Sequence, residues 1–223
     1  RVSLPGYRPQ FEGHRLQVNK AARAINNAKR PLLYVGGGAV ISGAEKEIRE
    51  LVDRAKIPIT TTLMALGIYP EDQELALEML GMHGTQYANK ATLETDLVIA
   101  IGARFDDRVT GRLDEFIAQA DIIQIDIDPA EIGKNLDVEI PIVGDVKDVL
   151  LEILPFIEAK ENGKWQQRIK ELKAKYPLKY EDDGSETIKP QYIMEEVDKY
   201  TNGESTIVTE VGQHQMWAAQ FHK

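Results

Sequence analysis

A short apolar run that ends at a glycine and a charged loop is the most constraining feature of this 223-residue sequence. Residues 97–101, LVIAI, are followed by Gly102, by Ala103 and by the charged stretch 104–108, RFDDR. Five consecutive apolar residues are typical of a strand that is buried on both faces of a parallel sheet. Ligands of such sheets bind beyond the carboxyl ends of the strands, so a glycine followed by two arginines suits an anionic cofactor. The alternative interpretation is a buried strand with a solvated charged loop.

Similar short runs alternate with stretches of helical spacing over the first 158 residues. The expected strands are 32–35, 58–62, 97–101, 121–128 and 139–145, and the expected helices are 14–30, 43–56, 84–95, 111–119 and 146–157. Residues 63–81 are expected to be irregular. Pro141 predicts that the last strand lies at a sheet edge, and Pro155 predicts a kink or an end in the helix that follows. The alternation predicts an α/β fold, a doubly wound parallel sheet with right-handed crossovers.

The pattern changes after residue 158. A charged helix is expected around 165–176, followed by a linker, then a helix over 190–200 and a strand over 205–210 that leads into another helix. One strand–helix unit cannot bury its own apolar face, so we expect a second domain to begin here and to be truncated. The chain is accordingly expected to be a piece of a longer polypeptide. The predicted organisation is an extended segment (1–13), a central domain (14–158), a linker (159–187) and the start of a second α/β domain (188–223).

Composition argues against several classes of function. The formal net charge of −9 argues against nucleic-acid binding, which needs a surplus of Lys and Arg. No apolar run approaches the roughly 20 residues that span a bilayer, and no apolar signal core is present at the start, so a soluble protein is expected. The absence of cysteine excludes disulfides and thiolate metal sites and is consistent with a cytoplasmic protein.

Two groups of residues are candidate nucleotide contacts. Gly36, Gly37 and Gly38 follow a predicted strand and could cradle a phosphate, although Ile41 occupies the last position of the dinucleotide fingerprint, where Gly or Ala is expected. A tight strand-to-helix turn is the alternative. Asp126 and Asp128 leave another strand on one face and could accept ribose hydroxyls. For this pair the alternatives are a metal site and a helix cap by Asp128.

The histidines carry little catalytic information. His83 lies in the segment 81–84, GMHG, at the same expected edge, but a lone histidine is more often a structural residue than a catalyst. The four histidines are too scattered to assemble a Ser/His/Asp or Cys/His arrangement, and no metal motif is present. The residues alone therefore predict a nucleotide-binding α/β domain without visible catalytic machinery.

Three segments together carry a resemblance to a known family. Residues 80–84 (LGMHG), 102–111 (GARFDDRVTG) and 211–220 (VGQHQMWAAQ) are similar to the large catalytic subunit of acetohydroxyacid synthase, or acetolactate synthase, a thiamine-diphosphate enzyme. The resemblance covers the whole chain, but only the middle of the family's subunit. It implies that the central domain binds FAD in an extended pose and that the flavin has a chiefly structural role.

The resemblance also implies specific contacts. The positions similar to the family's FAD contacts are Gly37, Thr62, Leu63, Leu80, Gly81, Met82, His83, Gly102, Ala103, Arg104, Phe105, Asp106, Asp126, Ile127, Asp145 and Val146. Met82, Asp107 and Arg108 resemble residues beside the substrate channel. Gln213 and His214 resemble residues near the thiamine diphosphate.

In the family, two pyruvates, or pyruvate and 2-oxobutyrate, condense with loss of CO2. The resemblance implies that the glutamate that activates the cofactor lies upstream of this chain, and that the Gly-Asp-Gly…Asn motif for Mg2+ lies downstream. No catalytic residue and no metal ligand is therefore expected within the 223 residues. The complete subunit is expected to form a homodimer or homotetramer, with a small regulatory subunit as a further possible partner.

Two other functions stay open at this stage. One is a pyruvate oxidase or related carboligase, in which the flavin is redox-active or is replaced by ADP. The segments 104–111 and 213–217 argue against it. The other is a nucleotide-binding module without turnover, which predicts that residues 200–223 join the core of the first domain.

Overall fold

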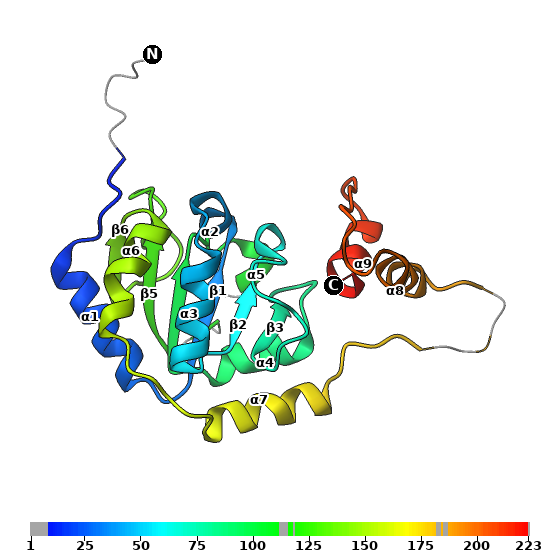
Figure 1. Ribbon diagram of the computed structural model, residues 1–223, viewed down its shortest axis with the longest axis horizontal. Coiled ribbons are helices and arrows are strands. Elements are labelled where there is room, and N and C mark those ends of the chain that lie inside the picture. Colours follow the sequence, from blue (N-terminus) through cyan, green and yellow to red (C-terminus); the bar gives the residue numbers. More distant parts are fainter. Residues whose placement is uncertain (1–8, 112–115, 118, 182–183, 185–186, 223) are drawn as a thin grey trace, which may run out of the picture.

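The computed structural model describes residues 9–111, 116–117, 119–181, 184 and 187–222, and its centre is a single parallel sheet (Figure 1). The sheet has six strands in the order β3-β2-β1-β4-β5-β6, and all five neighbouring pairs run parallel. The strands are β1 (Pro31–Val35), β2 (Ile59–Thr61), β3 (Ala76–Met79), β4 (Leu97–Ile101), β5 (Asp121–Asp126) and β6 (Ile140–Val143). The predicted α/β class and the parallel sheet are confirmed.

Helices cover both faces of the sheet. The α-helices of the described residues are α1 (Arg15–Asn27), α2 (Gly37–Ser42), α3 (Glu45–Ala55), α4 (Gln86–Glu94), α5 (Asp107–Thr110), α6 (Val146–Ile153), α7 (Lys164–Lys175), α8 (Pro190–Thr201) and α9 (Gln213–Phe221). Helices α1, α3 and α6 pack together on one face and α4 packs on the other, while α7 packs against α4 along the amino end of the strands. Within the described residues, no helix combines the length and the apolarity that crossing a membrane requires.

The alternation of side chains along β4 supplies both cores. Leu97, Ile99 and Ile101 join the cluster under α1, α3 and α6, whereas Val98 and Ala100 join a cluster on the opposite face. Every residue of β4 is buried, as expected for a central strand of a doubly covered sheet. The sheet is thus a fixed platform from which the loops at its carboxyl edge project.

Helix α7 packs along the amino end of the sheet, beside α4 (Figure 1). Trp165 is buried, its indole Nε1 donates to the carbonyl of Pro31 at 2.9 Å, and Ile169 is buried below the same helix. The guanidinium of Arg168 donates to both carboxylate oxygens of Glu94 on α4, at 2.7 and 2.9 Å. The sequence predicts this helix but not its packing; the domain boundaries themselves stay a prediction.

The prediction for residues 63–81 is wrong in one part, because this region contains the edge strand β3. Its apolar run is short and is interrupted by Glu78, which adopts a positive φ of 57°. The pairing with β2 shifts register between Ile59 and Thr61. A run of four residues whose third member is charged shows too little hydrophobic periodicity to distinguish a strand from a loop.

The expectations for the two prolines are confirmed. Pro141 lies in β6, which is an edge strand, and Pro155 lies in the 3-10 turn Leu154–Phe156 that ends α6. The helix expected over 43–56 is α3. It is separated from α2 by Gly43, whose φ of 68° interrupts the helical path.

Two other predicted elements differ. Residues 112–115 and 118 of the helix expected over 111–119 lie outside the described residues; the short helix of this region is α5, which precedes them. It begins early because the Asp106 carboxylate accepts from the N–H of Arg108 at 2.9 Å and caps it. Residues 205–210 are not a strand, because they have no neighbouring strand to pair with in the described chain.

Candidate functional site

The order of the strands creates a crevice between β1 and β4. These strands are neighbours in the sheet, but the chain runs from β1 outward to β2 and from β4 outward to β5. At such a switch point the loops after the two strands diverge and leave room for a ligand at the carboxyl edge. The backbones still meet at the base of the crevice, where the N–H of Gly36 donates to the carbonyl of Ile101 at 3.0 Å.

The glycines after β1 and β4 are required by this close approach. A Cβ on Gly36 would lie 2.2 Å from the carbonyl oxygen of Gly102, and Gly102 itself has a φ of 55°. The N–H of Gly38 donates to the carbonyl of Gly102 at 3.0 Å. Two of the three N–H groups in the triplet are therefore used within the backbone. These bonds fit the tight-turn interpretation, and a phosphate contact of the triplet stays a prediction.

A cleft of about 410 Å3 opens above this junction, and we call it the edge cleft. It brings together residues from the ends of four strands or the loops after them: Gly37, Thr62, Gly102, Ala103, Arg104, Asp106 and Asp126. All seven belong to the predicted set. The convergence that the sequence predicts, of positions 37, 102–106 and 126 on one edge of the sheet, is confirmed for the residues that line this cleft.

A second, more apolar cleft of about 320 Å3 continues from the first, and we call it the apolar cleft. It shares Thr62, Met64 and Asp106 with the edge cleft. Its other lining residues are Leu63, Met79, Leu80, Met82, His83, Arg108, Val109 and Met216. The predicted residues Leu63, Leu80, Met82, His83 and Arg108 are thus brought together here. The two clefts form one trough along the carboxyl edge.

Polar groups in the trough are poised for a ligand. The Thr62 hydroxyl, in the wall shared by both clefts, is buried and has no hydrogen-bond partner among the described residues. An unpaired buried hydroxyl is costly, so it is a natural contact for a bound polar group. Burial raises the pKa of the half-buried Asp126 carboxyl, although one of its oxygens accepts from the N–H of Asp128 at 2.9 Å.

Several predicted residues lie away from the cleft linings. Phe105 is buried beside Tyr34, with 5.7 Å between the ring centroids, and Ile127 is partly exposed beyond β5. Asp145 accepts from the Ser42 hydroxyl at 2.6 Å and caps α6, and Val146 is buried in the core below it.

The remaining predicted residues lie at helix starts and in a turn. Asp107 is exposed at the start of α5, and Gln213 and His214 are exposed at the start of α9. Gly81 forms a turn with a φ of 103°, and a Cβ there would lie 2.8 Å from the carbonyl oxygen of Arg108. This contact fixes the turn against the loop after β4.

Several residues that line the trough were not predicted from the sequence. Ile41 on α2 is 90% exposed, and Met64 is 74% exposed, although both are apolar. Glu131 and Met216 were also missed. Ile41 and Met64 could have been found because they are apolar but lie outside the core-facing stripe of their helix or turn. Exposed apolar side chains of this kind gather at binding surfaces.

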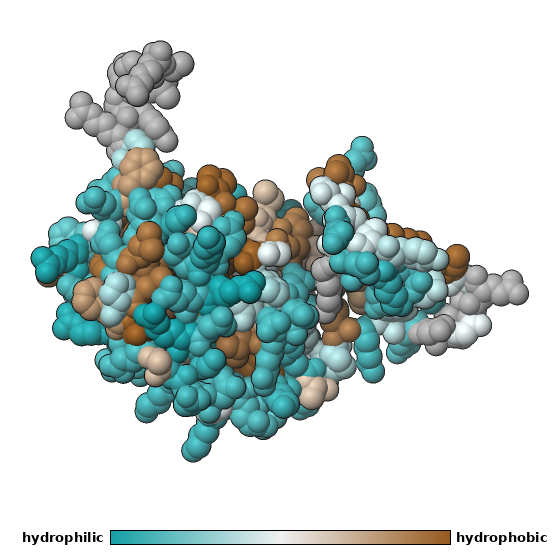
Figure 2. Space-filling view, in the orientation of Figure 1, coloured by the Kyte–Doolittle hydropathy of each residue, from teal (hydrophilic) through white to brown (hydrophobic). Residues whose placement is uncertain are grey.

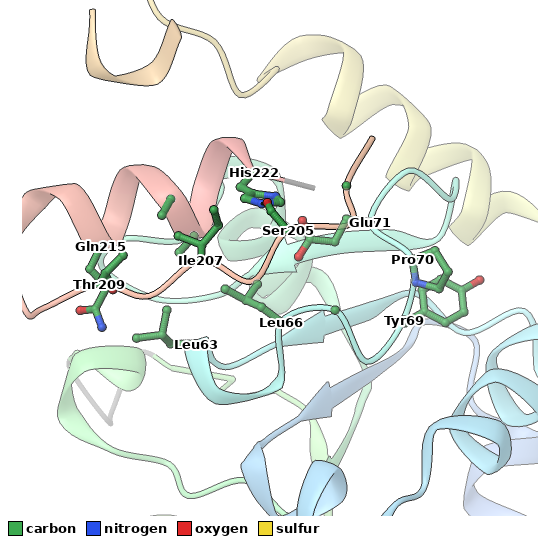
Figure 3. Close-up of a pocket in the computed structure, with 14 residues that line it drawn as sticks. Leu63, Leu66, Tyr69, Pro70, Glu71, Ser205, Ile207, Thr209, Gln215 and His222 are labelled. Carbon is green, nitrogen blue, oxygen red and sulfur yellow. The ribbon is translucent and has the colours of Figure 1, made fainter. Parts of the chain in front are cut away.

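A third cavity, of about 520 Å3, lies between the loop 63–71 and the C-terminal segment (Figure 3). In this view Ser205 and His222 lie side by side, with Leu66 on the opposite wall. The His222 ring contacts the Ser205 hydroxyl through Nε2 and the Asp198 carboxylate through Nδ1, each at 3.0 Å. These contacts fix the end of α9 to α8. They also correct the expectation that the histidines are too scattered for a Ser/His/Asp arrangement, because the fold of the C-terminal segment brings Asp198, His222 and Ser205 together.

Comparison with known proteins places the chain in a family. Residues 18–153 match the family described as thiamine pyrophosphate enzyme, central domain. The chain is 48% identical over its whole length to a probable acetolactate synthase large subunit from Methanocaldococcus jannaschii, of which it covers 39%. It is 49% identical over its whole length to an acetolactate synthase large subunit from Pyropia yezoensis, of which it covers 38%.

A similar protein from Corynebacterium glutamicum, also an acetolactate synthase large subunit, is 46% identical over 99% of the chain, which covers 36% of it. The chain thus spans less than two fifths of the length of these relatives. The matched region contains the whole sheet, from within α1 to the end of α6. The chain belongs to the thiamine pyrophosphate enzyme family, in which it contains the central domain.

Proposed function

We propose that this chain is the FAD-binding central part of an acetolactate synthase large subunit, followed by the start of the thiamine-diphosphate domain. The observation that supports the proposal is the continuous trough at the carboxyl edge, because the motif residues at 80–83 and 102–108 line it. The relatives named above support the enzyme assignment, since their similarity extends over the full chain.

The residues of the trough fit a flavin dinucleotide. Arg104 in the edge cleft offers a guanidinium to a pyrophosphate, and Asp126 offers a carboxylate at a strand end to ribose hydroxyls. The unpaired hydroxyl of Thr62 offers a further contact, and the apolar cleft suits a flat ring. Bound FAD would supply a two-electron acceptor, and we propose that its role here is chiefly structural.

The described residues do not by themselves build a site for thiamine diphosphate. Gln213 and His214, proposed to lie near that cofactor, are exposed and line none of the three cavities. We therefore expect no catalytic step from the described residues alone. Met82 and Arg108, proposed to border the substrate channel, lie in the apolar cleft, whereas Asp107 does not line it.

The wider assignment follows from the same proposal. The substrates would be pyruvate and 2-oxobutyrate, and thiamine diphosphate and Mg2+ would act in the complete subunit. That subunit would be cytoplasmic and would assemble as a homodimer or homotetramer, with a small regulatory subunit as a possible partner. We expect the purified 223-residue chain to form no acetolactate.

One alternative makes a prediction that the structure does not meet. A nucleotide-binding module without turnover would place residues 200–223 in the core of the first domain. Within the described chain, α8 buries no residue and α9 buries Phe221 alone, outside the clusters around the sheet. A pyruvate-oxidase-like enzyme would use the same trough, and no feature of the described residues favours it.

The proposal is tested by titrating the chain with FAD and following flavin fluorescence. We expect saturable binding that weakens about tenfold in Arg104→Ala and in Asp126→Ala, the loss expected for one charge-assisted hydrogen bond. Arg23→Ala, an exposed change on α1, is the matched control and should leave the Kd unchanged. Absence of any flavin binding, or equal weakening in the control, would contradict the proposal.

A further inference from the structure

The turn 81–84 carries two residues of the apolar cleft, Met82 and His83, and both side chains are exposed. A turn between a strand and a helix can occupy several positions unless its backbone is fixed by contacts from outside. The position of this turn therefore decides the shape of the apolar cleft.

The sheet part of the molecule fixes the beginning of the turn. The Asn89 side chain on α4 accepts from the N–H of Gly81 and donates to the carbonyl of Gly81, each at 3.0 Å. The N–H of Met82 donates to the carbonyl of Arg108 at 3.1 Å. These three bonds hold Gly81 and Met82 from within the central domain.

The carbonyl of His83 is bonded from the other part of the chain, although the N–H of Gly84 donates to the carbonyl of Gly81 at 3.0 Å within the turn. The Gln220 side chain on α9 donates through Nε2 to the carbonyl of His83 at 2.7 Å. Met216, four residues earlier and hence on the same face of α9, lines the apolar cleft. One face of α9 thus both closes the cleft and contacts the turn that shapes it.

The position of Gln220 is set by the C-terminal helices. Two residues after it, the His222 ring contacts Asp198 of α8 through Nδ1 and Ser205 through Nε2. Helix α9 therefore reaches the turn from a fixed position on α8. Any movement of α8 and α9 relative to the sheet would be transmitted to the backbone of His83 through the Gln220 hydrogen bond.

We propose that Gln220 is a positioning residue for the cofactor trough, which couples the seating of α9 to the placement of Met82 and His83. The identity of the ligand in the trough rests on the proposed function, whereas the coupling of α9 to the turn does not. Gln220 acts through the backbone of the turn, because its bond is to the carbonyl of His83.

Hydrogen exchange of peptides that cover residues 80–85 tests the coupling in the 223-residue chain. Gln220→Glu keeps the size of the side chain but removes the donor, so exchange in this peptide should rise about three- to tenfold, as expected when one neutral hydrogen bond is lost. Gln220→Lys restores a donor of sufficient reach and should return exchange close to the wild-type rate. Asn89→Ala is the positive control, and Gln86→Ala, an exposed amide on α4, is the neutral control.

Unchanged exchange in Gln220→Glu, or equally raised exchange in Gln220→Glu and Gln220→Lys, would overturn the proposal. An FAD titration of the same variants separates the two proposals. Severalfold weaker FAD binding in Gln220→Glu, recovered in Gln220→Lys, is the expected result, and an unchanged Kd in Gln220→Glu would overturn the link to the trough. If hydrogen exchange changes in the Gln220 variants but the chain binds no FAD, the coupling of α9 to the turn would stand and the proposed function would be rejected.

Discussion

The sheet with its covering helices and the C-terminal pair α8–α9 differ in how they are stabilised. Helix α3 buries five of its residues, whereas α8 buries none and α9 buries Phe221 alone. Apolar side chains such as Ile193, Tyr200 and Val211 remain exposed around α8 and α9, and Figure 2 shows hydrophobic surface over this part as well. The first region carries its own core, whereas the second buries little apolar surface and is joined by polar contacts of His222 and by the ring pair Tyr180–Phe221.

The largest expected difference between the two regions concerns one aromatic residue in each. Trp165→Ala removes a buried indole and its hydrogen bond to Pro31, so we expect a loss of about 3–5 kcal/mol in the free energy of unfolding. Tyr200→Ala on α8, where the side chain is 85% exposed, should change it by less than about 0.5 kcal/mol. Urea denaturation followed by circular dichroism measures both. Equal losses of unfolding free energy in the two variants would contradict the difference in stabilisation between the two regions.

A smaller difference is expected for glycine substitutions. In Gly36→Ala the new Cβ would lie 2.2 Å from the backbone carbonyl of Gly102, and a backbone shift of this kind costs about 1–3 kcal/mol. In Gly212→Ala the new Cβ would meet the His214 ring at 2.9 Å, and that side chain can move away. We therefore expect a clear drop in thermal midpoint for the first variant alone. A comparable drop for Gly212→Ala would show that the start of α9 is packed as tightly as the edge of the sheet.

The smallest effect is on the pH dependence of stability. Hydrogen bonds from Arg168 hold the pKa of the Glu94 carboxyl below its ordinary value. Folding then favours the ionised form, so this contribution is complete above the unfolded-state pKa and is lost as the pH falls from about 5 to about 3. Glu94→Gln should flatten the decline in unfolding free energy over this range. Glu196→Gln, which breaks an ion pair within α8, is the matched control. Identical profiles for the wild type and Glu94→Gln would show that the α4–α7 pair adds nothing.

The sequence predicts the sheet better than it predicts its surroundings. Runs such as 97–101 and 32–35 are apolar enough to identify a buried strand, and the glycines that directly follow them, Gly102 and Gly36, mark the carboxyl edge. Strand β3 was not predicted because Glu78 interrupts its short apolar run. The packing of α7 was not predicted because its buried residues, Trp165 among them, are separated by charged ones. Only the tertiary structure identifies the residues that they contact.

The residues of the candidate site also fall into a group that the sequence predicts and a group that it does not. Residues that directly follow strands, such as Arg104 and Asp126, were found because parallel strands end at one edge. Ile41 and Met216 were missed because they lie on helices, where only the relative placement of the elements brings them to the trough. The role of Gln220 could not be predicted, since its partner is a backbone carbonyl 137 residues away.

We propose above all that the carboxyl edge of the sheet holds a flavin dinucleotide. Hydrogen exchange of the chain with and without FAD tests it most directly, because peptides covering 36–38, 102–106 and 126–128 report on three separate loops. We predict that all three become protected together at the FAD concentration that saturates the fluorescence change, while 190–201 is unaffected. Protection confined to other regions, or none in these three loops at saturation, would contradict the account.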